Sequence, residues 1–170
     1  RRIQDLNKTR IRENLTKHSK DMFTGNSKLI RSFEDTNTKE KDIVLARWDV
    51  KDPYGNILKK EGEAIVSKIP RGLSFSLCFV DASINEKAIQ LIIREFGGKC
   101  IYLIDNMDSR KFEQEFKVET YPLSRQNLQF IERFKVKKLP TKITKEGEYI
   151  MTRTLNSKRI IFESKKEEIE

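Results

Sequence analysis

The chain has 170 residues, of which 36% are hydrophobic and 36% charged, and its 35 Lys and Arg against 26 Asp and Glu give a formal net charge of +9. A chain of this length buries most of its unfolded surface on folding, so it needs neither a structural metal nor a disulfide framework. No run approaches the roughly 18 to 20 apolar residues of a membrane-spanning helix, which excludes an integral helical membrane protein. The single His and two Cys lack the spacing of zinc ligands and predict no metal site.

The positive charge is concentrated at the start of the chain. Residues 1–31 carry nine basic and three acidic residues. Their apolar residues are sparse, which predicts a basic helix that docks on a partner or stays mobile. Residues 32–42 hold one apolar residue and are predicted to be a flexible linker, so residues 1–42 form a helical arm and linker. Aromatic residues are not interleaved with the basic ones, so we expect a solvated surface and no direct contact with nucleic acid.

Residues 43–70 predict a β-hairpin. Its turn is Asp52-Pro53-Tyr54-Gly55-Asn56, in which Pro presets the backbone angle and Gly closes the turn between two β-rich runs. Trp48 falls in the first strand of this hairpin. A Trp at such a position is typical of a core or interface anchor.

Alternating strands and helices predict an α/β domain over residues 71–156. An apolar strand at residues 75–80 is followed by a helix that begins at the capping box of Ser83 and Glu86, ends at two glycines and leads into a second apolar strand at residues 99–104. This order is a βαβ unit, so the two strands should be parallel.

The rest of the domain is predicted to hold two more helices and a second hairpin. The expected elements are a helix at residues 108–116, a short strand at 118–121, a helix capped by Ser124, and hairpin strands at 135–144 and 149–154. Residues 157–170 are predicted to be a frayed terminal helix or a tail.

These elements, with Leu139-Pro140-Thr141 before the second hairpin, resemble a thioredoxin-like fold. The expected architecture is therefore an α/β, three-layer thioredoxin-like core preceded by a β-hairpin and the amino-terminal helical arm. In that fold a cis proline lies beside the redox site, and Pro140 occupies the matching position. The resemblance implies a cis bond between Leu139 and Pro140, which an X-Pro peptide allows at low cost.

The cysteine pair of a thioredoxin site is missing. The matching residues are Asp81-Ala82-Ser83-Ile84, and the two cysteines, Cys78 and Cys100, lie in neighbouring strands. Aligning the strand ends offsets them by two residues, which places them beyond the usual disulfide span of about 7 Å. We therefore expect two small buried hydrophobic residues and no enzyme activity. A thiol-disulfide oxidoreductase that uses either cysteine remains the alternative.

A narrower resemblance covers residues 43–155. The hairpin at residues 48–63, the strand end Phe79-Val80-Asp81 and the segment at residues 132–143 come in the order found in the TraW family of F-type conjugative transfer systems. This resemblance implies a non-catalytic periplasmic assembly protein of a type IV secretion system, which acts in pilus assembly and conjugation and binds a TrbC-like thioredoxin-fold partner. The chain starts at Arg1, so we expect a processed or partial chain in which any signal peptide is not seen.

The predicted site is a protein-binding surface without catalytic residues, cofactor or metal. An open groove beside the cis proline would accept an extended polypeptide by backbone pairing. The candidate contact residues are Asp81, Ala82, Ser83, Leu139, Pro140 and Trp48. A DNA-binding accessory protein is a third and weaker alternative, motivated by the net charge alone.

Overall fold

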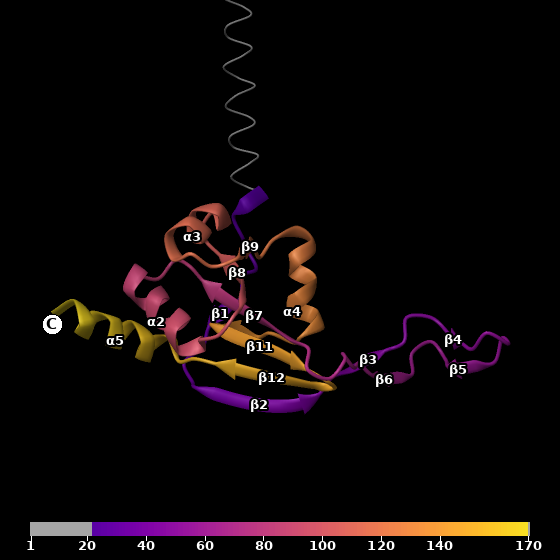
Figure 1. Ribbon diagram of the computed structural model, residues 1–170. Coiled ribbons are helices and arrows are strands. Elements are labelled where there is room, and N and C mark those ends of the chain that lie inside the picture. The colour runs from indigo at the N-terminus through magenta and orange to yellow at the C-terminus, as the bar shows by residue number, and fades with distance from the viewer. Residues whose placement is uncertain (1–21, 170) are drawn as a thin grey trace, which may run out of the picture.

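The computed structural model describes residues 22–169. Most of the predicted basic helix falls on residues 1–21, which lie outside the described residues. Residues 24–31 are not helical, so the predicted helix does not extend over them. Figure 1 shows a body of mixed α/β structure from which one long hairpin projects.

A six-stranded mixed sheet forms the centre of the body. Its spatial order is β2 (Thr36–Lys41), β12 (Tyr149–Thr154), β11 (Thr141–Glu146), β7 (Ser74–Asp81), β8 (Ile101–Asp105) and β9 (Thr120–Pro122). β7, β8 and β9 are parallel, which confirms the predicted βαβ unit, whereas β11, β12 and β2 run antiparallel to their neighbours.

Helices cover both faces of the sheet, so the body has three layers. The helices are α2 (Glu86–Phe96), α3 (Ser109–Phe116), the 3₁₀ turn η1 (Arg125–Leu128), α4 (Gln129–Arg133) and α5 (Ser157–Ile169). Alternate residues of β7 point to opposite faces: Val80 packs with α2, α3 and α5, and Phe79 packs with the η1–α4 side. Each face therefore has its own apolar core.

Helix α2 begins two residues later than the sequence predicts. Its N-cap is Asn85, whose side chain accepts a 2.8 Å hydrogen bond from the Ala88 amide. The predicted capping box of Ser83 and Glu86 is therefore wrong. The helix ends at Gly97, as expected, and the Nζ of Lys142 donates to the carbonyls of Phe96 and Gly97 at 2.7 and 3.2 Å. This cation satisfies carbonyl groups that a helix end leaves unpaired.

Two segments predicted to be loose are ordered parts of the body. Most of the predicted linker at residues 32–42 is strand β2, whose six residues pair with β12 at the edge of the sheet. Of the two alternatives predicted for residues 157–170, a frayed terminal helix or a tail, the helix is confirmed: α5 packs on α2 and buries Ile160 completely. Arg159 of α5 forms salt bridges with Asp35 and Glu95, which attach α5 to the body, and with Glu163 of the same helix.

Three short ladders complete the structure. β1 (Ile30–Arg31) pairs in parallel with β10 (Lys138–Leu139), β3 (Ile43–Leu45) pairs with β6 (Ala64–Val66), and β4 (Val50–Lys51) pairs with β5 (Ile57–Lys59). The last two ladders build the projecting hairpin and confirm the hairpin predicted around Asp52-Pro53.

Candidate functional site

The carboxyl ends of the parallel strands hold Asp81, Ala82 and Ser83, which the sequence predicts to be contact residues. Asp81 ends β7 and accepts hydrogen bonds from Asn106 Nδ2 at 2.8 Å, the Ser83 amide at 3.0 Å and Arg31 Nε at 3.3 Å. Burial acts to raise the pKa of Asp81, but these hydrogen bonds outweigh it, and the pKa lies below its ordinary value. Asp81 is therefore a charged anchor at neutral pH.

The neighbouring carboxylate at the end of β8 is more deeply buried. Asp105 is 2% exposed and accepts hydrogen bonds from the Ser27 amide, at 2.8 Å, and from the Ser27 hydroxyl. Burial raises the pKa of Asp105, and the Ser27 hydrogen bonds offset this only in part. Asp81 and Asp105 thus bind Arg31 and Ser27, which both precede the first strand of the central sheet.

Residues 24–32, which we call the strap, cross this edge of the sheet. The Gly25 carbonyl accepts from the Asn106 amide at 3.0 Å, and the Ser32 amide donates to the Leu139 carbonyl at 2.8 Å. Gly25 lies so close to the strand ends that an added Cβ would come within 2.6 Å of the Leu123 amide nitrogen. The strap therefore occupies the groove in which the sequence predicts a partner polypeptide.

The strap covers most of the predicted contact residues. The peptide bond between Leu139 and Pro140 is cis, as expected, and both residues are buried, as is Ala82. Ser83 is exposed, but its hydroxyl accepts from Arg31 of the strap at 3.0 Å. The prediction of an open groove is wrong, because β1 already makes the backbone pairing with β10 that a partner would make.

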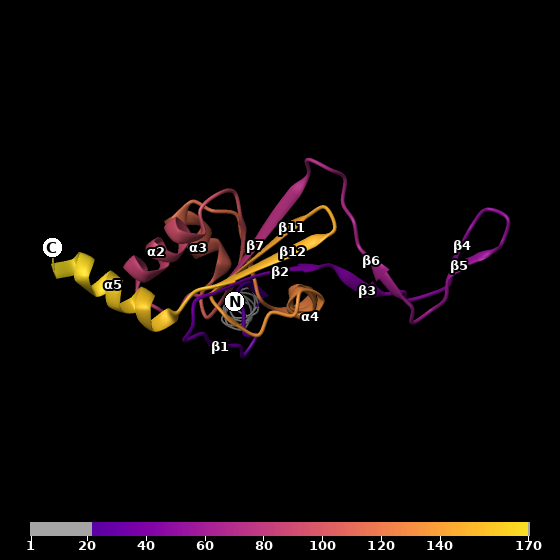
Figure 2. The same ribbon diagram turned by 90° about the horizontal axis from the view of Figure 1, so that it is seen from below.

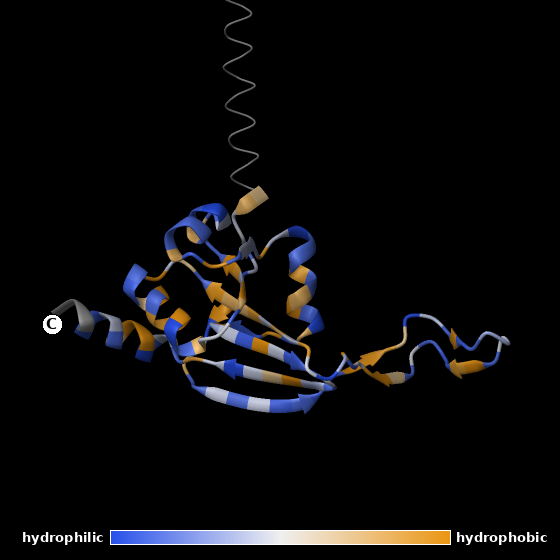
Figure 3. Cartoon of the chain, in the orientation of Figure 1, coloured by the Kyte–Doolittle hydropathy of each residue, from blue (hydrophilic) through white to orange (hydrophobic). Residues whose placement is uncertain are grey.

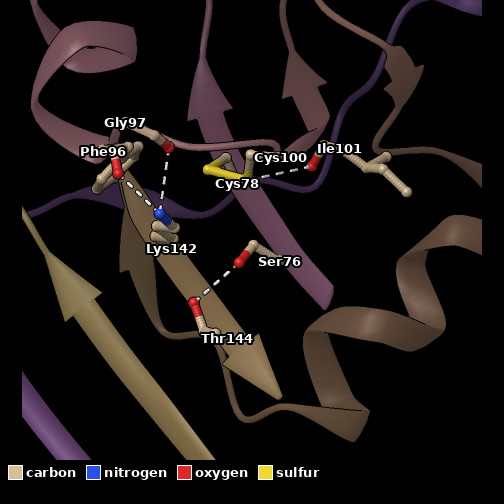
Figure 4. Close-up of a disulfide and its surroundings, with 8 residues drawn as sticks. All are labelled: Ser76, Cys78, Phe96, Gly97, Cys100, Ile101, Lys142 and Thr144. Atoms are coloured by element: carbon tan, nitrogen blue, oxygen red, sulfur yellow. Dashed lines mark hydrogen bonds between the residues drawn. A yellow bond between two sulfur atoms is a disulfide. The ribbon is translucent and has the colours of Figure 1, made fainter. Parts of the chain in front are cut away.

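The two cysteines form a disulfide, which corrects the prediction that they are separate thiols (Figure 4). The expected strand register holds, because Cys78 pairs with Tyr102. However, Cys100 lies just before the first ladder residue, Ile101, and the two Cα atoms are 6.2 Å apart, which is within the usual disulfide span. Positions 78, 100 and 102 share one face of the sheet, and the disulfide lies in the core beneath α2.

The disulfide is mostly buried and away from any helix N-terminus, although Cys100 lines a cavity with Lys99 and Lys142. Cys78 is fully buried and Cys100 is 8% exposed. Cys100 follows the C-terminus of α2, whereas thiolates are stabilised at helix N-termini. The arrangement is suited to holding β7, α2 and β8 together.

Trp48 lies far from the strap, on the projecting hairpin, which we call the arm (residues 43–66; Figure 2). Four large side chains of the arm are more than 60% exposed: Leu45 (67%), Trp48 (69%), Tyr54 (90%) and Leu58 (62%). Figure 3 shows apolar residues at the two ladders of the arm, β3–β6 and β4–β5, with hydrophilic stretches between them. Exposed apolar surface of this extent marks an interaction site.

A buried ion cluster at the base holds the arm in place. Asp42, just before β3, receives both guanidinium nitrogens of Arg133 at 2.8 and 2.7 Å and the Nζ of Lys145 at 2.7 Å. Lys145 also donates to the Ser67 carbonyl at 2.6 Å, just after β6. Burial acts to raise the pKa of Asp42, but Arg133 and Lys145 keep it below its ordinary value.

Sequence reasoning missed both the strap and this cluster. Gly25, Ser27 and Arg31 form no recognisable motif, because their partners are about 50 to 100 residues away. Lys145 did carry a signal, since strand alternation places it on the same inward face as Ile143. A lysine on a core face needs a buried counter-ion.

Neither a metal site nor a membrane-crossing helix is found in the part of the chain that the structure describes. The arrangement offers instead a rigid body with a closed groove and one exposed apolar arm. Comparison of the chain with protein-family models, with curated proteins and with solved structures finds no match.

Proposed function

We propose that this chain is a non-catalytic assembly protein that works by binding another protein through its arm. The arm carries the proposal, because it presents large apolar side chains to solvent while its base is fixed to the body by Asp42, Arg133 and Lys145. A preformed arm loses little conformational freedom on binding, which favours affinity. Trp48, a predicted contact residue that is 69% exposed, can meet a partner without rearrangement of the body.

We propose a thioredoxin-like body for this protein. The order β12–β11–β7–β8, the βαβ unit and the cis proline before β11 support this fold. A body of that kind with its groove filled by its own chain is suited to a structural role rather than to substrate turnover.

The proposed setting is the periplasm, in an F-type type IV secretion system that assembles a conjugative pilus, with a TrbC-like protein as partner. The TraW resemblance over residues 43–155 includes the arm. The disulfide between Cys78 and Cys100 supports an oxidising compartment, because such bonds are rare in a reducing cytosol. The same buried disulfide gives no support to thiol-disulfide exchange.

Co-purification with the TrbC-like protein tests this proposal. The variant Trp48→Ala combined with Leu58→Ala removes two exposed apolar side chains of the arm, and we expect at least a tenfold loss of affinity, as for interface hot spots. Phe162→Ala is the matched control, because Phe162 is 60% exposed but lies on α5. Equal binding by the wild-type and arm variants, or measurable insulin reduction by the wild-type chain, would overturn the proposal.

A further inference from the structure

Strand β2 leaves one edge of the central sheet open. Its six residues pair with β12 on one side, and no other backbone hydrogen bond reaches them from the described part of the chain. Figure 1 shows β2 as the outermost strand of the sheet, with the arm leaving from its end. The strand contains no proline and pairs without a bulge, so the N–H and C=O groups of its outer edge are available to another strand.

The charges of this edge do not oppose pairing with a second copy of the same strand. Residues 35–41 carry two acidic and two basic side chains, so this segment is neutral although the whole chain has a net charge of +9. Opposed residues of an antiparallel pair share one face of the sheet. A two-fold axis between two copies must therefore lie at a residue that opposes its own counterpart.

One register of such a pair brings no like charges together. An axis at Lys39 or at Glu40 would set that residue opposite the same charge, which is destabilising. An axis at Thr38 pairs residues 36–40 of the two copies, with Lys39 opposite Asn37 and Glu40 opposite Thr36. The sequence of β2 therefore complements itself in this register.

A cavity beside β2 favours the same register. Thr36, Thr38 and Glu40 share one face of the strand and line a cavity of about 340 Å³ together with Lys135 and Lys137, which follow α4. Glu40 and both lysines are exposed and form no ion pair among the described side chains. Because Glu40 of a second copy would oppose Thr36, its carboxylate would meet a cavity that holds two ammonium groups without a counter-ion.

We propose that two copies of this chain pair antiparallel along the open edges of β2, with Thr38 at the two-fold axis, and join their six-stranded sheets into one continuous sheet. The arm leaves from the C-terminal end of β2, so the pair carries its two arms at opposite ends of the joined strands. Two arms on one particle can bind two sites at once, which raises the overall affinity. This inference goes beyond the proposed function and does not depend on what the arm binds.

Cysteine cross-linking in the full-length chain tests the register. Thr38→Cys adds one free thiol, because the native cysteines are bonded to each other, and sets it opposite its own counterpart. Disulfides form only when the Cα atoms lie within about 7 Å, so we expect mild oxidation to give a covalent dimer roughly ten times faster than in the control. The control is Tyr121→Cys, an exposed position on β9 at the other edge of the sheet. Lys39→Cys, whose thiol faces Asn37, should also react more slowly than Thr38→Cys.

Sedimentation equilibrium of the full-length chain measures the dimer itself. We expect the wild type to self-associate, and Glu40→Lys to raise the Kd of the dimer about tenfold, because it sets a third ammonium group beside Lys135 and Lys137. Adding Lys137→Glu should restore the wild-type Kd. Glu115→Lys is the matched control, since it makes the same change in net charge at an exposed position of α3.

Four outcomes would overturn this inference. They are a wild type that stays monomeric and gives no Thr38 cross-link, a cross-link that forms fastest at Lys39, a dimer that Glu40→Lys leaves unchanged, and an equal effect of Glu40→Lys and Glu115→Lys. None of these results touches the proposed function, which co-purification with the TrbC-like protein measures independently.

Discussion

At the scale of single residues, Asp42 connects three separate segments of the chain, and no sequence motif predicts this role. Its carboxylate holds Lys145 of β11 and Arg133 of α4, and its backbone carbonyl accepts from the Ser67 amide at 2.7 Å. Ions this deeply buried gain stability from one another only while all partners are present. Asp42 therefore attaches the base of the arm to the central sheet.

Asp42→Ala is expected to lower the free energy of unfolding by about 3–5 kcal/mol, because it leaves the Lys145 charge buried without its partner. Urea denaturation measures this loss. Glu148→Ala is the control, since its pairs with Lys41 and Lys68 are exposed and worth about 0–1 kcal/mol. Equal losses in the two variants would contradict the assigned role.

The stability lost in Asp42→Ala is expected to depend on pH. The pKa of Asp42 is lower in the folded chain than in the unfolded chain, so its charge contributes stability above the ordinary carboxyl pKa of 3.8, and this contribution is lost as the pH falls through the folded value. The difference between wild type and Asp42→Ala should therefore be full at neutral pH and shrink below about pH 4. A difference that grows on acidification would contradict this sign.

At the scale of elements, the strap depends on one residue without a side chain. Gly25→Ala would place a Cβ against the Ile104 carbonyl and the Leu123 amide, which are backbone groups that cannot move aside. We expect a loss of about 1–3 kcal/mol, as for overpacking, and faster amide exchange at Ser32. Asn26→Ala, at an exposed strap position, should leave both unchanged. Slow exchange at Ser32 in the Gly25 variant would show that the strap tolerates a side chain there.

The disulfide makes a second prediction at this scale. Its cysteines are 22 residues apart in sequence, and a loop of that length gives about 3 kcal/mol of stability. Cys78→Ala with Cys100→Ala should lose this amount, and a reducing agent should destabilise the wild type but not the variant. Titration of the wild type should find no free thiol until a reducing agent is added. Two reactive thiols in the untreated protein would contradict the bond.

Elements with a periodic apolar face or a recognisable turn could be predicted from the sequence, and elements with neither could not. The β7–α2–β8 unit was visible because its apolar residues follow the periods of strand and helix. Strand β2 was taken for a linker because all six of its residues are exposed and only its backbone pairs with β12. The disulfide was missed because an ideal ladder was extended to Cys100, which lies outside it.

At the scale of the whole molecule, the described residues contain the predicted hairpin and a mixed α/β body, and the strap lies beside the cis proline where the sequence predicts a partner. The hairpin and the α/β body follow from local patterns, whereas the cis proline was expected from the resemblance to a thioredoxin-like fold. The groove did not remain open, because closure depends on contacts between the strap and residues at the far end of the chain, such as Leu139 and Ser157. Pairing between residues so far apart in the chain produces no local sequence pattern. Because the strap fills the groove, the candidate binding surface is the arm.

The arm should be separable from the body. Its two ends meet where the Ser67 amide donates to the Asp42 carbonyl, and Lys145 bonds to both residues. A short glycine linker can therefore replace residues 43–66. We expect the free energy of unfolding of the body to change by no more than about 1 kcal/mol, with amide protection of β7 and β11 retained, while binding to the partner is lost. Urea denaturation, hydrogen exchange and co-purification measure these three results. A body that unfolds without the arm would show that the two parts form one cooperative unit, and an armless chain that still binds would place the interface elsewhere on the body.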